Sequence, residues 1–244
     1  MPKYGLIGYP LGHSFSQKYF TEKFLQEGIE NVSFENFSIP SIEDLDDVLL
    51  NNPDLKGLAV TIPYKKQVMD YLDETDAAVK QIGACNCITI RNGKLTGYNT
   101  DIIGFEQSFI RHLQPHHKQA LILGTGGAAL AIEYVLNKLS IPFQYVSRRQ
   151  QDNTITYSSI TESIIDNHKI IINCTPLGTY PEVNECPPLP YEFLTERHYL
   201  YDLVYNPPLT RFLKEGAERG AVIQNGYDML VLQAEANWEI WNAS

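Results

Sequence analysis

A glycine-rich turn is the first feature of the sequence that indicates chemistry. Gly124-Thr125-Gly126-Gly127 follows a short apolar run over residues 120–123 and opens a helical pattern over 127–139. Because Gly126 has no Cβ atom, the backbone there can approach a pyrophosphate, which the positive N-terminal end of the helix then attracts. A turn that merely needs glycine is the alternative, and the strand–turn–helix context favours the phosphate loop.

Two arginines follow the next strand candidate, residues 141–146, in the sequence Ser147-Arg148-Arg149. A site for NAD needs an acidic residue near this point to accept a hydrogen bond from the ribose 2′-hydroxyl. A guanidinium instead offers planar, bidentate recognition of a phosphate group. Two arginines at a strand end also fit a solvated turn, but their spacing from Gly124 favours NADP over NAD.

Lys65 and Asp101 are the candidates for acid–base chemistry. Lys65 follows a predicted strand over 57–62 and begins a predicted helix over 64–72, where a cation opposes the helix dipole and is unfavourable for stability. A solvated surface lysine is the alternative, and this argument alone leaves the two even. Asp101 precedes a helical pattern over 102–113, so it fits a helix N-cap as well as a carboxylate partner for Lys65.

Uncharged hydrogen-bonding side chains gather near the same predicted strand and helix ends. Ser14 and Ser16, together with His13, lie in a glycine-rich loop and suit a polyhydroxylated ligand. Ser16 is also the expected N-cap of the next helix. The other residues of this kind are Thr61, Asn86 and Gln233. Each of them, taken alone, is more often structural.

Two α/β units must position these residues. The first hundred residues alternate short strands and helices without a dinucleotide fingerprint, so this part is expected to hold the second substrate. Asn92-Gly93 predicts a hairpin turn there. We expect a substrate-binding domain over residues 1–103, completed by a C-terminal helix at about 227–244. Residues 104–226 are expected to form a Rossmann-like domain with a doubly wound parallel sheet.

Composition narrows the classes of partner. The 244 residues are 43% hydrophobic with a net charge of −10, which fits one large or two modest domains and argues against nucleic acid. No apolar run is long enough for a transmembrane helix, and the N-terminus lacks the pattern of a signal peptide. The default expectation is therefore the cytoplasm. Four cysteines fit a reducing compartment. Two of them, Cys85 and Cys87, are expected to point to the same side of the chain and to serve as small apolar residues rather than metal ligands. No metal site is expected.

Seven motifs occur in family order, and the sequence resembles the shikimate dehydrogenases along nearly its whole length. The motifs are GYPLGHSFS (8–16), GLAVTIPYK (57–65), GACN (83–86), GYNTD (97–101), NCTPLG (173–178), DLVYNP (202–207) and GYDMLVLQ (226–233). Each motif is short, but seven of them in order are specific.

The resemblance implies an NADP-dependent interconversion of shikimate and 3-dehydroshikimate by a two-domain α/β protein, in the route to aromatic compounds. It implies Lys65 and Asp101 as the catalytic pair. The expected substrate contacts are Ser14, Ser16, Thr61, Asn86, Asp101, Gln233 and, at the cleft, Tyr205. The expected contacts of NADP are Gly124, Thr125, Gly126, Gly127, Ala128, Ser147, Arg148, Arg149 and Thr175, with Gly226 and Met229 near the nicotinamide.

The sequence departs from the family pattern at three places. Ala59 stands where the motif usually has Asn, so one polar contact is expected to be missing or supplied elsewhere. Ser147 replaces the usual Asn before the arginine. The chain also looks short after Trp241, so a trimmed closing helix is expected.

Three alternatives stay open. A quinate or quinate/shikimate dehydrogenase using NAD tends to carry Thr at the position of Ser16 and an acidic residue at that of Arg148. A catalytically silent paralogue that senses metabolites would not need both Lys65 and Asp101. An NADP-binding redox sensor would leave the first hundred residues unexplained. Family members are monomers or homodimers, and the sequence does not decide between the two states.

Overall fold

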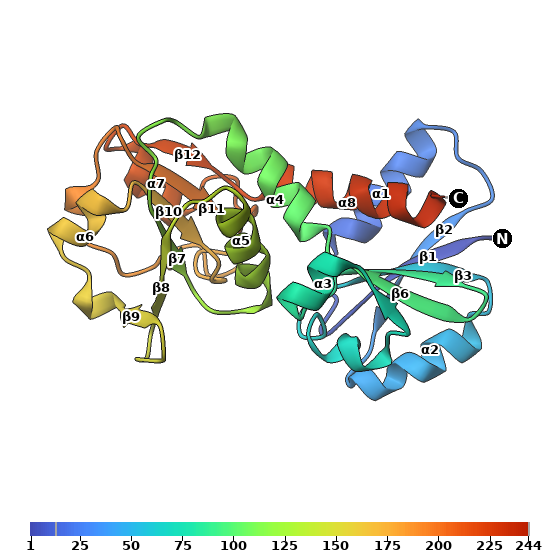
Figure 1. Ribbon diagram of the computed structural model, residues 1–244. Coiled ribbons are helices and arrows are strands. Elements are labelled where there is room, and N and C mark those ends of the chain that lie inside the picture. The colour runs from blue at the N-terminus through green and yellow to red at the C-terminus, as the bar shows by residue number, and fades with distance from the viewer. Residues whose placement is uncertain (13, 244) are drawn as a thin grey trace. The chain divides into compact units, whose positions relative to one another are not determined.

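The computed structural model describes residues 1–12 and 14–243 and divides into two compact units (Figure 1). Unit 1 contains Met1–Ile103 and Val231–Ser244, and unit 2 contains Gly104–Leu230. Both boundaries fall inside helices, α4 (Asp101–Phe109) and α8 (Tyr227–Asn242), so each of these helices contributes residues to both units. In the described part of the chain, no helix has the length and apolar character needed to cross a membrane.

Unit 1 is built on a six-stranded mixed sheet with the strand order β2-β1-β3-β5-β6-β4. The strands are β1 (Lys3–Gly8), β2 (Ser33–Ser38), β3 (Leu55–Val60), β4 (Glu74–Thr75), β5 (Cys87–Arg91) and β6 (Lys94–Tyr98). β1 pairs in parallel with β2 and β3, whereas β5 is antiparallel to β3 and β6. The predicted hairpin is confirmed: Asn92 and Gly93 have φ values of 52° and 78°, as a type I′ turn requires.

Helices cover both faces of this sheet. They are α1 (Phe15–Gln26), α2 (Leu45–Asn51) and α3 (Ala77–Ile82), with 3₁₀ turns η1 (Ile42–Asp44) and η2 (Gln67–Tyr71). α1 and the unit 1 part of α8 pack on one face, and α2 and α3 on the other (Figure 1). A Cβ atom at Gly57 of β3 would lie 2.3 Å from Trp241 Cδ1 of α8, so glycine lets that helix pack closely on the strand.

Three local predictions in unit 1 are wrong. The N-cap of α1 is Ser14 rather than Ser16, since Ser14 has extended backbone angles and its side chain accepts from Gln17 N. No α-helix forms over 64–72, where turns lead into η2. Cys85 and Cys87 lie in the apolar clusters of opposite faces, because β5 begins only at Cys87 and strand alternation does not extend to Cys85.

Unit 2 is built on a six-stranded sheet in which every pair is parallel. The strands are β7 (Ala120–Leu123), β8 (Phe143–Ser147), β9 (Thr154–Thr156), β10 (Ile170–Asn173), β11 (Tyr199–Asp202) and β12 (Val222–Gln224). Their order, β12-β11-β10-β7-β8-β9, is the 3-2-1-4-5-6 arrangement of a dinucleotide-binding fold, read from the β9 edge. The predicted doubly wound fold is therefore confirmed, and its switch point lies between β7 and β10.

Helices again cover both faces of the parallel sheet. They are α5 (Gly127–Lys138), α6 (Glu162–Asn167) and α7 (Arg211–Ala217), with 3₁₀ turns η3 (Ile110–His112), η4 (Tyr157–Ser159) and η5 (Tyr191–Phe193). α4 and α5 lie on one face and α6 and α7 on the other (Figure 1). Phe105 and Phe109 of α4 make ring contacts with Tyr201 of β11, whereas Ile165 of α6 and Phe212 of α7 share the opposite core.

Candidate active site

Lys65 and Asp101 form a short ion pair in unit 1. Lys65 Nζ lies 2.6 Å from Asp101 Oδ2, and the two side chains are 17% and 7% exposed. The structure thus brings together the two residues proposed as an acid–base pair, although 36 positions separate them in the sequence. The Lys65 side chain keeps limited contact with solvent.

The backbone of the turn after β3 fixes the position of Lys65. Tyr64 N donates to Thr61 O at 2.9 Å, and Cys85 N donates to Lys65 O at 2.8 Å. The second bond places Lys65 beside the segment that carries Asn86. The helix-dipole argument for Lys65 does not apply, because this residue lies in a turn rather than at the start of an α-helix. Its contact with Asp101 is what distinguishes it from a surface lysine.

Asp101 is the first residue of α4 and not the residue before the helix. Its second carboxylate oxygen, Oδ1, accepts from Asn86 Nδ2 at 2.9 Å. One oxygen therefore serves Lys65 and the other serves Asn86. The carboxylate is held from two sides, and its role as a partner of Lys65 replaces the N-cap interpretation.

A chain of buried polar groups continues from Asn86 to α8. Thr100 N donates to Asn86 Oδ1 at 2.7 Å, and Thr100 Oγ1 donates to Asn237 Oδ1 at 2.7 Å. Asn237 Nδ2 in turn donates to Gln233 Oε1 at 3.4 Å. The sequence did not single out Thr100 or Asn237. A usable signal existed for Asn237, because it follows Gln233 by four residues and so lies on the same helical face.

The remaining expected substrate residues lie at several places. Ser14 caps α1, Ser16 lies inside its first turn, and Thr61 follows β3. Gly8 lies against Thr61, since a Cβ atom there would be 2.5 Å from Thr61 Cγ2. Tyr205 belongs to unit 2, whereas the other expected substrate residues belong to unit 1. His13 lies outside the described residues.

The glycine turn lies at the switch point of the parallel sheet. Gly124 has a φ of +100°, and a Cβ atom there would be 3.0 Å from Thr175 Cγ2. The loops after β7 and β10 are therefore adjacent. Gly126 is the N-cap residue of α5, and among the described residues no atom beyond its two chain neighbours lies within 4 Å of the place a Cβ would take. This open space beside the helix N-terminus fits a pyrophosphate, so the residues present suit a dinucleotide.

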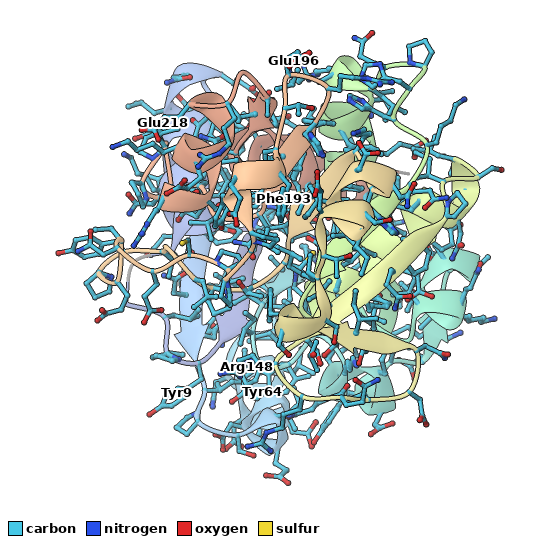
Figure 2. The ribbon with its side chains drawn as sticks, turned by 90° about the vertical axis from the view of Figure 1, so that its left-hand side faces the viewer. Tyr9, Tyr64, Arg148, Phe193, Glu196 and Glu218 are labelled. Carbon is cyan, nitrogen blue, oxygen red and sulfur yellow. The ribbon has the colours of Figure 1, made fainter. Side chains whose placement is uncertain are left out.

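The end of β8 carries the two arginines, both exposed. Arg148, labelled in Figure 2, and Arg149 have no ion-pair partner among the described residues. Ser147 is buried, and its hydroxyl donates to the carbonyl oxygen of Arg149, which fixes the turn. The guanidinium groups are thus available to an added phosphate, as a ribose 2′-phosphate requires.

A buried carboxylate organises the strand ends beside this turn. Asp202 accepts from Asn173 Nδ2 at 2.9 Å, from Thr210 Oγ1 at 2.6 Å and from Val204 N at 3.0 Å. Burial raises the pKa of Asp202 to about 6, and these three hydrogen bonds only partly offset that effect. Asn173 Oδ1 accepts from both the backbone and the hydroxyl of Thr175. Asp202 therefore supports the loop of Thr175 through Asn173.

Gly226 and Met229 lie near the start of α8. A Cβ atom at Gly226 would lie 2.2 Å from Leu203 O, so a side chain is excluded there. Gly226 N donates to Val204 O at 3.2 Å, and Met229 is buried. These contacts hold the beginning of α8 against the segment that follows β11.

The cysteines and Ala59 are placed for packing. Burial raises the pKa of Cys85 to about 12 and that of Cys174 above its ordinary value as well, so these groups stay as neutral thiols. Ala59 is buried in the apolar cluster that also contains Leu6 and Ala234.

Comparison with known proteins gives consistent matches. Residues 6–88 match the family model described as the shikimate dehydrogenase substrate binding domain. A shikimate dehydrogenase (NADP(+)) of Bacillus cereus strain 03BB102 is 37% identical over 260 residues, covering 98% of this chain and 91% of the relative.

Solved structures with the same fold include a shikimate 5-dehydrogenase from Thermus thermophilus in complex with NADP(H) and shikimate. It is 27% identical, with a TM-score of 0.88 over 100% of this chain and 94% of that one. A quinate dehydrogenase from Corynebacterium glutamicum in complex with NAD is 23% identical, with a TM-score of 0.87 over 100% and 94% of the two chains. At 23% identity, the likeness to the quinate dehydrogenase concerns the fold alone.

Proposed function

The chain belongs to the shikimate dehydrogenase family, and on this premise we propose that it reduces 3-dehydroshikimate reversibly to shikimate with NADPH. The observation in this chain that carries the proposal is the ion pair between Lys65 and Asp101, 2.6 Å long and largely buried. The pair gives an NADP-binding α/β protein the acid–base group that a ketone reduction requires.

The proposed mechanism assigns the proton to Lys65. Bound NADPH supplies the hydride that reduces the ring ketone. Lys65 Nζ faces the ketone oxygen and donates a proton or a hydrogen bond to it as negative charge develops, so the cation stabilises charge that is greatest in the transition state. Asp101 keeps the ammonium group oriented through its 2.6 Å contact. In the oxidation of shikimate, Lys65 accepts the hydroxyl proton in its neutral amine form.

The substrate is held by uncharged and charged groups of unit 1. We assign this role to Ser14, Ser16, Thr61, Asn86, Asp101 and Gln233, with Tyr205 contributed by unit 2. The buried amide of Asn86 already fixes Asp101, so a substrate hydroxyl bound there would meet groups whose positions are set beforehand. Pre-set geometry of this kind supplies much of the acceleration in enzymes that hold reacting groups together.

The cofactor contacts are assigned to the carboxyl edge of the unit 2 sheet. The pyrophosphate would bind at Gly124, Thr125, Gly126, Gly127 and Ala128, with Thr175 from the neighbouring loop. Arg148 and Arg149, assisted by Ser147, would bind the 2′-phosphate, and Gly226 and Met229 would contact the nicotinamide. Support for this assignment comes from the open space at Gly126 and from the exposed arginines.

A four-way assay tests the proposal: shikimate or quinate, each with NADP⁺ or NAD⁺, followed by the absorbance of the reduced nicotinamide. Fast reduction with shikimate and NADP⁺ alone is the expected result. Turnover with quinate or NAD⁺ would instead favour the quinate-type activity and direct attention to Ala59. If NADP⁺ binds tightly but no combination reacts, the chain is a sensor rather than an enzyme.

The state of the protein in the cell forms part of the same proposal. The four cysteines are free thiols, which suits the reducing cytoplasm as the site of action. We expect a monomer or a homodimer. Light scattering on the purified protein distinguishes these two states.

A further inference from the structure

Asn237 is a fully buried amide on α8 that the proposed mechanism does not use. It is 0% exposed, and its helix neighbours Ala234, Ala236 and Trp241 are buried apolar residues. A polar side chain in such surroundings is stable only when its hydrogen-bonding groups are satisfied. The oxygen of Asn237 accepts from Thr100 Oγ1 at 2.7 Å, and its nitrogen donates to Gln233 Oε1 at 3.4 Å.

The polarity of this chain of hydrogen bonds is fixed from the catalytic end. An ionised carboxylate only accepts, so Asp101 requires the NH₂ group of Asn86 to face it. The oxygen of Asn86 then faces Thr100 N at 2.7 Å. The hydroxyl of Thr100 has two amide oxygens within reach and donates to the nearer one, Asn237 Oδ1 at 2.7 Å rather than Asn86 Oδ1 at 3.2 Å.

The same polarity determines how Gln233 is oriented. Because the oxygen of Asn237 faces Thr100, its NH₂ group faces α8 and meets the oxygen of Gln233. A glutamine side chain has several rotatable bonds and loses entropy when a ligand orders it. A hydrogen bond from a buried neighbour removes part of that cost before the ligand arrives.

We infer that Asn237 is a positioning residue for shikimate, which orients the Gln233 amide and links it through Thr100 and Asn86 to the Lys65–Asp101 pair. This inference rests on the proposed function and on Gln233 as a substrate contact. Asn237 touches neither substrate nor cofactor; its effect on binding passes through Gln233.

Asn237→Leu is the principal test variant, since leucine has the same branched side-chain shape and makes no hydrogen bond. The KM for shikimate should rise about tenfold, the factor expected when a buried hydrogen-bonded partner is lost. The value of kcat should change by less than about threefold, and the KM for NADP⁺ should stay unchanged. If the leucine variant does not fold, Asn237→Ala replaces it, because alanine cannot overpack the site. The same rise in the KM for shikimate is expected for Asn237→Ala.

A double-mutant cycle with Gln233→Leu separates positioning from a general structural role. In the Gln233→Leu background, adding Asn237→Leu should raise the KM for shikimate no further. Asn242→Leu is the matched control, because Asn242 is an exposed asparagine of the same helix whose side chain donates to Trp238 O. Its KM should equal that of the wild type.

The outcomes distinguish this inference from the proposed function. If the wild type oxidises shikimate and Asn237→Leu has a wild-type KM, the inference is wrong. It is equally wrong if the two substitutions raise KM independently. If the wild type does not oxidise shikimate at all, the proposed function itself fails, whatever the variants do.

Discussion

At the scale of single residues, Lys65 is the group on which the proposed reaction depends most. In the proposed mechanism Lys65→Ala removes the cation that faces the developing charge, so it should lower kcat by about 100- to 1,000-fold, with little change in the KM for shikimate. Initial rates with saturating NADP⁺ measure both constants. Lys66→Ala is the control, since Lys66 is exposed and adjacent and should keep wild-type rates. A Lys65→Ala enzyme with most of its turnover would remove this lysine from the mechanism.

Arg148 determines cofactor choice in the proposal. Arg148→Gln removes a charged donor to the 2′-phosphate and should raise the KM for NADP⁺ by about 10- to 100-fold, while the KM for NAD⁺, which lacks that phosphate, hardly changes. The ratio of the two constants is the measurement. Arg197→Gln changes another exposed arginine of unit 2 and should leave the ratio as it is. Equal weakening of both cofactors would contradict phosphate recognition at Arg148.

At the scale of elements, the sequence predicted strands better than caps and short helices. The run that became β7 has its predicted bounds, because a fully apolar run defines both of its ends, and the predicted hairpin turn lies between β5 and β6. β9 and α6 were not predicted, since Thr154–Thr156 and Glu162–Asn167 are short and polar. Periodicity also could not show that Lys65 lies in a turn, nor that Thr100 and Asn237 connect the site, because those facts depend on tertiary contacts.

The ends of β10, β11 and α7 provide an element-scale prediction. Asp202 accepts hydrogen bonds from all three segments. Asp202→Asn places an NH₂ group against these donors, so the free energy of unfolding should fall by about 1 to 3 kcal/mol. Thermal unfolding measures the loss. Asp152→Asn, an exposed position of the same unit, should lie within about 0.5 kcal/mol of the wild type. An unchanged Tm for Asp202→Asn would show that the strand ends are held by other contacts.

At the scale of the whole molecule, motif order predicted the family and the fold, while physical reasoning from single residues was weaker. Lys65 alone was an even choice between catalysis and surface exposure, and its pairing with Asp101 favours catalysis. The dinucleotide-binding strand order could not be read from the sequence, because it depends on which strands pair across the switch point between β7 and β10. The glycine turn predicted only that such a point exists.

Buried histidines of unit 2 make stability depend on pH. Burial lowers the pKa of His117 to about 4 and lowers that of His198 as well. Because the ordinary value is 6.5, the unfolded chain binds protons between pH 6.5 and 4 that the folded chain does not. The buried histidines therefore leave the free energy of unfolding highest above pH 6.5, and they lower it as the pH falls toward 4. The loss from His117 should be about 1 to 3 kcal/mol.

His117→Asn isolates this effect. His117 Nδ1 accepts a hydrogen bond from Gln114 N. The side-chain oxygen of asparagine can accept the same bond, and asparagine takes up no proton. Burial raises the pKa of Asp202, so Asp202 titrates in the same window with the opposite sign, gaining stability as the pH falls. Since Asp202 is present in both proteins, the comparison cancels its contribution.

Denaturant unfolding at pH 7 and pH 5 should give a smaller loss on acidification for His117→Asn than for the wild type. His112→Asn, a half-exposed histidine whose ring also contacts Tyr199, should keep the wild-type difference. Equal losses in all three proteins would mean that His117 does not govern the acid sensitivity of unit 2.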